Sequence, residues 1–184
     1  MEQKYYKLEL ITALLNSKSH TRELARKISK SHMLVVRKLR ELKNENAVDY
    51  ASEGRNKVYF LKKTIEAKAY AMMAEQYKLV NAVNKYPLLR NIISQIQRNE
   101  KIKIALLFGS YARGTAGKES DIDIYIDTDD STIKKQLEPL STKLNIKVGL
   151  YNESNLLIKE INKNYVIIKG AEEYYAKRKL LEQA

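Results

Sequence analysis

The sequence predicts an α+β protein in two parts: three helices and a β-hairpin, then an α/β unit with a mixed sheet. Three observations lead to this prediction. Apolar residues recur at helical spacing through the first 44 residues, and two strand-like runs follow around Gly54. An apolar run over residues 102–108 stops at a glycine, and residues 120–126 then alternate acidic and aliphatic side chains. A long helical pattern, residues 64–85, connects the two parts.

In the N-terminal part, polar breaks separate the helical patterns, and a polar hexapeptide around Gly54 separates the strand-like runs. A glycine in such a segment indicates a hairpin turn. The predicted helices span residues 4–16, 21–28 and 32–44, and the predicted strands span residues 47–50 and 58–61.

The positive charge of the chain is concentrated in the same part. Residues 1–63 carry 15 Lys and Arg against 7 Asp and Glu, a net charge of +8 out of the total of +12. Residues 64–184 carry 19 against 15, a net charge of +4. A basic first third indicates a polyanionic partner, although charge alone is explained equally well by a lysine-rich solvated surface.

Three helices followed by a basic hairpin resemble the winged helix-turn-helix domain of bacterial and archaeal regulators. The resemblance covers residues 4–63, and we assign residues 1–63 to this domain. It implies a third helix in the major groove of double-stranded DNA and a hairpin tip on the backbone or minor groove. A winged helix that dimerises or docks another protein is the alternative. The positions implied to contact DNA are Ser31, His32, Arg37, Lys38, Arg55, Asn56 and Lys57.

Residues 64–86 are predicted to form one linker helix. Its apolar positions recur at alternating steps of four and three, which is heptad spacing. The helix either packs against both parts or forms the seam of a homodimer, and the seam is favoured because DNA-binding winged helices usually act in pairs. The heptad positions are Ile65, Ala69, Met72, Gln76, Leu79 and Val83.

Residues 87–184 are predicted to form the α/β unit, with a first helix that starts at Pro87 and runs to Arg98. Later helices are predicted over residues 131–144, 152–162 and 171–181, and strands over residues 102–108, 120–126, 145–151 and 165–169.

The segment around residues 106–126 contains a candidate site for a metal-bound nucleoside triphosphate. Asp121 and Asp123 lie on one face of a strand, about 7 Å apart, and a cation such as Mg²⁺ or Mn²⁺ would remove their repulsion. Gly109 and Ser110 lie at a strand-to-helix turn, where backbone N–H groups can bind phosphate. Arg113, one turn further on, adds a positive charge.

The stretch Gly109-Ser110-Tyr111-Ala112-Arg113-Gly114, followed after five residues by Ser120-Asp121-Ile122-Asp123, resembles the signature of minimal nucleotidyltransferases of the polymerase-beta-like superfamily. The alternative, a glycine turn before an acidic solvated strand edge, leaves the spacing of these residues as a coincidence. The resemblance implies that Asp121 and Asp123 are catalytic and bind metal, and that Gly109, Ser110, Arg113 and Ser120 bind nucleotide.

Members of this superfamily normally carry a third acidic residue on the next strand, and in this chain Gly149 is expected at that position. Without it a second metal is poorly held, so nucleotide binding is expected to survive better than catalysis. Glu119, Asp127 or a carboxylate of a partner subunit could substitute, or the strand could have another register.

Two functions follow from these observations. The first is Mg²⁺-dependent transfer of a nucleoside monophosphate from an NTP to a hydroxyl of a small molecule, a nucleic acid or a protein such as a toxin. The second is a DNA-binding transcriptional regulator whose nucleotidyltransferase-like domain is impaired by Gly149 and acts as a sensor or remains as a vestige.

The composition excludes several other classes. The chain has no cysteine, which excludes disulfides and thiolate metal sites, and neither His20 nor His32 has a second ligand at metal-binding spacing. No apolar run reaches the length of a membrane span or resembles a signal peptide. A cytoplasmic protein that does not enter the membrane is expected.

Overall fold

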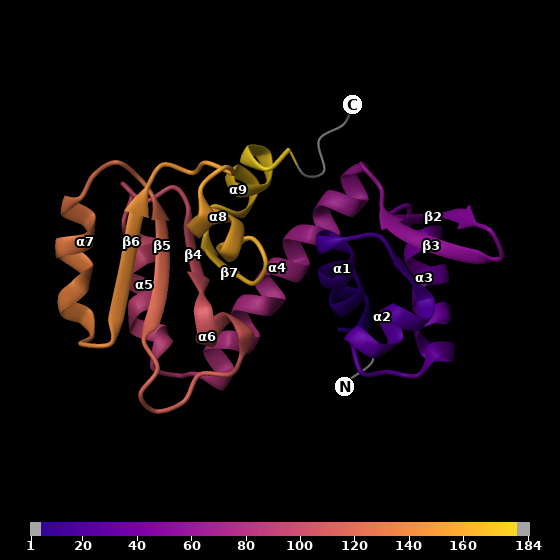
Figure 1. The fold of residues 1–184 in the computed structure, drawn as a ribbon, viewed down its shortest axis with the longest axis horizontal. Coiled ribbons are helices and arrows are strands. Elements are labelled where there is room, and N and C mark those ends of the chain that lie inside the picture. Colours follow the sequence, from indigo (N-terminus) through magenta and orange to yellow (C-terminus); the bar gives the residue numbers. More distant parts are fainter. Residues whose placement is uncertain (1–4, 180–184) are drawn as a thin grey trace. The chain divides into compact units, whose positions relative to one another are not determined.

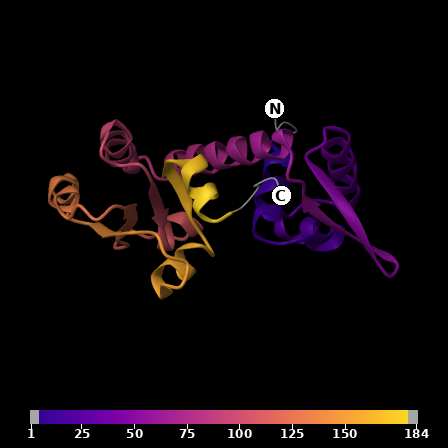
Figure 2. The same cartoon turned by 90° about the horizontal axis from the view of Figure 1, so that it is seen from above.

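Residues 5–179 are described by the structure, a computed structural model, and they divide into two units (Figures 1 and 2). The first unit runs to Glu75 and includes Lys179, and the second comprises Gln76–Arg178. The division falls within a single long helix, α4, which spans Ile65–Lys85.

The first unit contains three helices and a three-stranded antiparallel sheet with strand order β1-β3-β2. The hydroxyl of Ser31 begins the third helix by accepting a hydrogen bond from the Leu34 N–H at 3.3 Å. Leu10, Leu24 and Leu39, one from each helix, are fully buried. The elements are α1 (Tyr6–Asn16), β1 (Ser19–His20), α2 (Thr21–Lys27), α3 (His32–Asn44), β2 (Val48–Glu53) and β3 (Asn56–Leu61).

The hairpin of this unit is longer than predicted. Its ladder continues to the pair Glu53 and Asn56, so only Gly54 and Arg55 form the loop. Gly54 has φ +59°, which suits glycine in a two-residue hairpin loop. The prediction stopped at the apolar residues, whereas backbone pairing extends into the polar residues beyond them.

Helix α4 covers nearly the same residues as the predicted linker helix, but its buried residues differ from the predicted ones. The predicted heptad line is split, because Ile65 is 78% exposed whereas Leu79 is buried in the second unit. Small side chains occupy most of the buried positions, and alanine gives only a weak hydrophobic signal in a sequence. The buried apolar residues of α4 are Ala67, Ala71, Ala74, Leu79 and Ala82.

The second unit contains a mixed four-stranded sheet with strand order β6-β5-β4-β7, in agreement with the predicted mixed sheet. Strands β5 and β6 are parallel, and β4 is antiparallel to both of its neighbours. The elements are α5 (Leu89–Arg98), β4 (Ala105–Phe108), α6 (Gly109–Arg113), β5 (Ile122–Asp127), α7 (Thr132–Leu137), a 3-10 turn η2 (Glu138–Leu140), β6 (Leu144–Gly149), α8 (Leu156–Ile161), β7 (Val166–Lys169) and α9 (Ala171–Lys177).

Two of the predicted helices are shorter in the structure. The helix predicted over residues 131–144 ends at Leu137, because Pro139 lies in the 3-10 turn that follows. The helix predicted from residue 152 begins at Leu156, since the Asn155 side chain caps it by accepting from the Leu157 N–H at 2.8 Å. The last helix is described to Lys177, and its predicted end at residue 181 lies outside the described residues.

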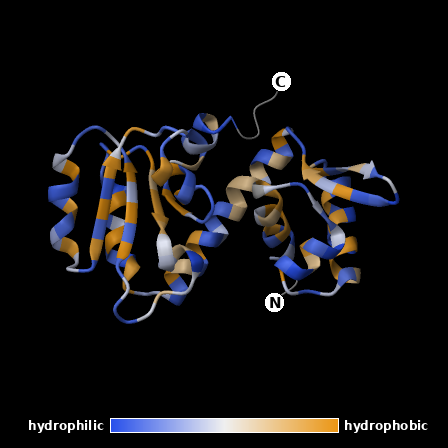
Figure 3. Cartoon of the chain, viewed as in Figure 1, coloured by the Kyte–Doolittle hydropathy of each residue, from blue (hydrophilic) through white to orange (hydrophobic). Residues whose placement is uncertain are grey.

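The two faces of β5 differ in chemistry. Ile122, Ile124 and Ile126 are fully buried in a core with residues of α5 and α7, whereas Asp123 and Asp127 lie on the opposite face. Helices α5 and α8 lie on opposite sides of the sheet (Figure 2). Strand β4 is hydrophobic along its length, whereas hydrophobic and hydrophilic residues alternate along β5 (Figure 3). Among residues 5–179, no helix is both long enough and apolar enough to cross a membrane.

Candidate active site

The centre of the candidate site is a contact between Gly109 and Asp123. Residue Phe108 at the end of β4 pairs with Asp123 on β5, so the chain turns into α6 directly beside the carboxylate. Gly109 has φ +68°, and a Cβ atom at this position would lie 2.3 Å from the Asp123 Oδ2. Backbone conformation and space therefore both require glycine here.

The two aspartates lie two residues apart at the start of β5. Asp121 directly precedes the strand and is exposed, whereas Asp123 is half-buried beside Gly109. Asn145 Nδ2 donates a hydrogen bond to Asp123 Oδ1 at 2.7 Å. The carboxylate is thus held from one side by β6 and from the other by the turn after β4.

Residues 114–116, which follow α6, are held by Lys85, the last residue of α4, and by the next residue, Tyr86. Lys85 Nζ donates to the Gly114 carbonyl at 2.8 Å, and the Ala116 N–H donates to the Tyr86 hydroxyl at 3.1 Å. The Tyr86 ring also packs edge-on against Tyr111, with 4.8 Å between centroids. The sequence analysis missed these contacts, because nothing in the local pattern connects residues 85–86 with residues 114–116.

The remaining predicted nucleotide-binding residues lie around this turn in different settings. Ser110 is half-buried in α6, and its carbonyl accepts from the Thr115 N–H at 2.9 Å. Arg113 is exposed. The Ser120 hydroxyl accepts from the Gly117 N–H at 2.9 Å and so closes the turn before Asp121.

Arg113 also contributes to the charge around α8. The pKa of Glu160 is lowered, chiefly by its hydrogen bond with Lys163 and to a smaller extent by the charge of Arg113. The guanidinium therefore acts on groups beyond its own turn.

The structure corrects the predicted position of the missing carboxylate. Gly149 pairs with Asp127, four residues along β5 from Asp123, and does not lie beside the candidate site. Asn145 is the residue of β6 that pairs with Asp123. The prediction placed β6 four residues out of register, because its alternating apolar residues fit both registers equally well.

Asp127 belongs to a separate structural cluster at the other end of β5. Its side chain is 4% exposed, accepts from the Tyr151 N–H at 2.9 Å and forms an ion pair with Lys177. The Tyr125 hydroxyl donates to the Gly149 carbonyl at 2.7 Å, and burial raises the pKa of Tyr125. The Asp127 carboxylate is therefore already paired, and it lies too far along β5 to act as a third carboxylate beside Asp121 and Asp123.

The donor chemistry of the site fits one hard cation. Asp121 and Asp123 could supply carboxylate oxygens, which Mg²⁺ prefers. Within the described part of the chain, no group of three or more His, Cys, Asp or Glu side chains could hold a metal ion.

The residues predicted to contact DNA lie partly on one exposed face of α3. Ser31, His32 and Arg37 are exposed, and His32 Nε2 lies 2.8 Å from the Thr21 hydroxyl. Arg40, which the sequence analysis did not select, is also exposed one turn beyond Arg37.

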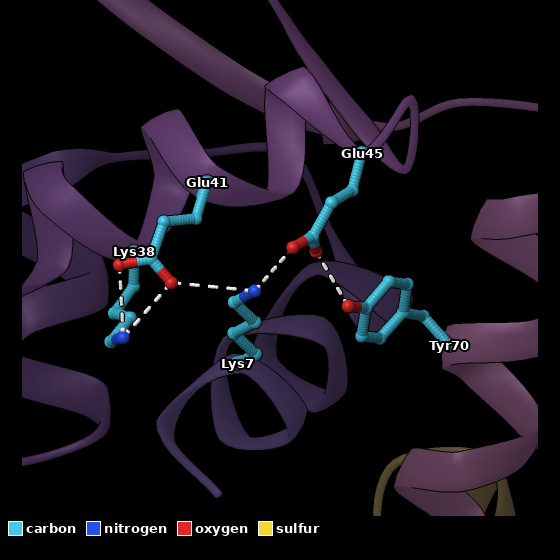
Figure 4. A network of polar contacts seen from close by, with 5 residues as sticks. All are labelled: Lys7, Lys38, Glu41, Glu45 and Tyr70. Carbon is cyan, nitrogen blue, oxygen red and sulfur yellow. Dashed lines mark hydrogen bonds and ion pairs between the residues drawn. The ribbon is translucent and has the colours of Figure 1, made fainter. Parts of the chain in front are cut away.

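Lys38 lies outside this face. Its side chain is 11% exposed, and its ammonium group bonds both carboxylate oxygens of Glu41 at 2.9 Å (Figure 4). Glu41 and Glu45 also pair with Lys7, and Glu45 accepts from the Tyr70 hydroxyl at 2.5 Å. The hydrogen bond with Lys38 lowers the pKa of Glu41. Lys38 is less exposed than Arg37 because adjacent helical residues point about 100° apart.

The hairpin residues Arg55, Asn56 and Lys57 are all exposed, as a role in binding requires. Lys57 Nζ lies 4.2 Å from the centroid of the Tyr50 ring, and Lys43 Nζ lies 4.5 Å from it. Two ammonium groups, one from β3 and one from α3, therefore make cation–π contacts with the Tyr50 ring.

Comparison with known proteins gives a family match, which lies within the second unit, and a similar protein. The family model for polymerase beta, nucleotidyltransferase, matches residues 90–174. A protein of Methanocaldococcus jannaschii, whose name reads "putative protein adenylyltransferase", is 38% identical over 73 residues. The match covers 38% of this chain and 85% of the relative.

Proposed function

The chain belongs to the polymerase beta nucleotidyltransferase family, and from this premise we propose that it binds an NTP with a divalent cation and transfers a nucleoside monophosphate to a hydroxyl group. The observation that carries the proposal is the contact between Gly109 and Asp123. It places the glycine turn, whose backbone N–H groups could bind a phosphate, directly beside a carboxylate that could bind the accompanying metal.

The chain's own residues would position the triphosphate. The N–H groups of Gly109 and Ser110 bind phosphate oxygens, and Arg113 adds positive charge. Asp121 and Asp123 would hold the cation, which would supply positive charge to neutralise the phosphates.

In the proposed reaction, the acceptor oxygen forms a bond to the α-phosphorus while the bond to the bridging oxygen breaks. Pyrophosphate leaves with the bonding electron pair, and water takes up the hydroxyl proton. The name of the relative supports ATP as the donor and a protein hydroxyl as the acceptor, and a toxin would be one such protein.

The first test is calorimetric titration with a non-hydrolysable ATP analogue, with and without Mg²⁺, on the full chain. We expect Mg²⁺-dependent binding that weakens by about 100-fold or more in Asp121→Ala/Asp123→Ala, since both metal ligands are lost. Asp129→Ala is the matched control, because this aspartate is exposed beyond the end of β5. Equal affinity with and without Mg²⁺, or in the double variant, would contradict the proposal.

We propose a second activity for the first unit, binding of double-stranded DNA by a winged helix. The element order α1-β1-α2-α3-β2-β3 and the exposed Arg37, Arg40, Arg55 and Lys57 support it. We further propose a cytoplasmic homodimer. If transfer is absent, the second unit would act as a nucleotide sensor for a transcriptional regulator.

On a selected DNA site, Arg40→Ala is expected to weaken binding by about tenfold, because an exposed arginine on α3 can contact phosphate or a base. Lys38→Gln is the matched control and should change affinity less than about twofold, because Lys38 is paired with Glu41. Fluorescence anisotropy at several salt concentrations measures both variants. A larger loss in Lys38→Gln than in Arg40→Ala would show that the assigned face of α3 is wrong.

A further inference from the structure

We infer that the candidate site binds a single divalent cation with its nucleotide, because Asn145 occupies the place where a carboxylate would be needed for a second one. The inference rests on the proposed nucleotide binding and specifies the metal content of the same site. Two-metal sites clamp the attacking and the leaving oxygens of a phosphoryl transfer with ions about 4 Å apart, and carboxylates hold both ions.

The position of Asn145 is fixed by the sheet. Strands β5 and β6 are parallel and in register over six residue pairs, with Asp123 beside Asn145. Neighbouring residues of paired strands point to the same face, so the amide and the carboxylate meet directly. The distance of 2.7 Å between Asn145 Nδ2 and Asp123 Oδ1 confirms this contact.

The orientation of the amide follows from the same contact. An ionised carboxylate can only accept hydrogen bonds, so the amide nitrogen must face Asp123. The amide oxygen of Asn145 is therefore turned away from the carboxylate. Asp123 Oδ1 is occupied by this hydrogen bond, and we assign metal binding to Oδ2, the oxygen that lies against Gly109.

Charge favours the same stoichiometry. Asn145 is neutral, whereas an aspartate at position 145 would add a negative charge beside Asp123, and the repulsion among the carboxylates would favour binding of a second cation. Asp127 lies four residues further along β5, about 13 Å away, and is paired with Lys177. Glu119 is exposed in the turn that Ser120 closes.

The test is equilibrium dialysis of this chain against Mn²⁺ and a non-hydrolysable ATP analogue, with the bound Mn²⁺ and the bound nucleotide both measured. Wild type is expected to bind one Mn²⁺ per bound nucleotide, and Asn145→Asp is expected to bind two. Gly149→Asp is the matched control, because it adds a carboxylate to the same strand where no atom lies within 4 Å of the new Cβ. This control should still bind one Mn²⁺.

Two Mn²⁺ per nucleotide in wild type would overturn the inference, as would one Mn²⁺ in folded Asn145→Asp or two in Gly149→Asp. The wild-type ratio decides the matter by itself if Asn145→Asp does not fold. Absence of any Mn²⁺-dependent nucleotide binding by wild type would reject the proposed function itself, which is a different result from nucleotide bound with two metals.

Discussion

Gly109→Ala is expected to weaken Mg²⁺-dependent nucleotide binding by about 100-fold, which corresponds to roughly 3 kcal/mol. The new methyl group would lie 2.3 Å from Asp123 Oδ2, the oxygen that we assign to the metal. Either the carboxylate or the turn must move, and either movement separates the phosphate-binding N–H groups from the metal ligand. Calorimetry with the same analogue measures the loss.

Alanine substitutions at two other glycines of the same segment distinguish the clash with Asp123 from backbone strain. Gly114 has φ +73°, and a Cβ atom there would have Lys85 Nζ as its nearest neighbour at 3.5 Å, so Gly114→Ala introduces backbone strain without a severe clash. We expect it to cost about 1–2 kcal/mol of stability with a smaller loss of affinity. Gly117 has no atom within 4 Å of its Cβ position, and Gly117→Ala should leave affinity unchanged. Equal affinities for Gly109→Ala and Gly117→Ala would show that the contact with Asp123 does not position a ligand.

The residues at the centre of the candidate site could be selected from the sequence because they lie close together along the chain. Gly109, Asp121 and Asp123 lie within 15 residues, and the end of an apolar run and a two-residue alternation define their geometry without distant information. The strands of the mixed sheet were predictable for the same reason, since each is either a short apolar run or a two-residue alternation. Family membership supports the nucleotidyltransferase resemblance.

The parts that could not be predicted depend on pairing between distant segments. Asn145 and Gly149 both lie on β6, and only the register with β5 shows which of them lies beside Asp123. The same holds for Lys85, which contacts Gly114 across 29 residues of sequence. The low exposure of Lys38 depends on its packing and on its ion pair with Glu41, which the helical spacing alone does not show.

Gly170→Ala is expected to have the largest effect on stability, a loss of roughly 3 kcal/mol or more in the second unit. Gly170 joins β7 to α9 with φ +76°, a conformation that costs an alanine about 1–2 kcal/mol. The new Cβ would also lie 2.0 Å from the carbonyl oxygen of Lys103 and 3.1 Å from a side-chain carbon of Ile104. A backbone oxygen cannot rotate away, so the segment before β4 must shift.

Native-state hydrogen exchange on the full chain measures this effect unit by unit. Amides of β4 and β7, which pair at Leu106 and Ile167, should lose protection in Gly170→Ala, whereas amides of β2 and β3 should not. Gly54→Ala is the matched control, because it combines φ +59° with no atom within 4 Å and lies in the first unit. It should lower protection only in its own hairpin. Unchanged exchange at Leu106 in Gly170→Ala would mean that the close approach of Gly170 to Lys103 does not exist in solution. Loss of protection at Leu106 would show that Gly170, in the turn between β7 and α9, stabilises β4 and thereby the position of Gly109.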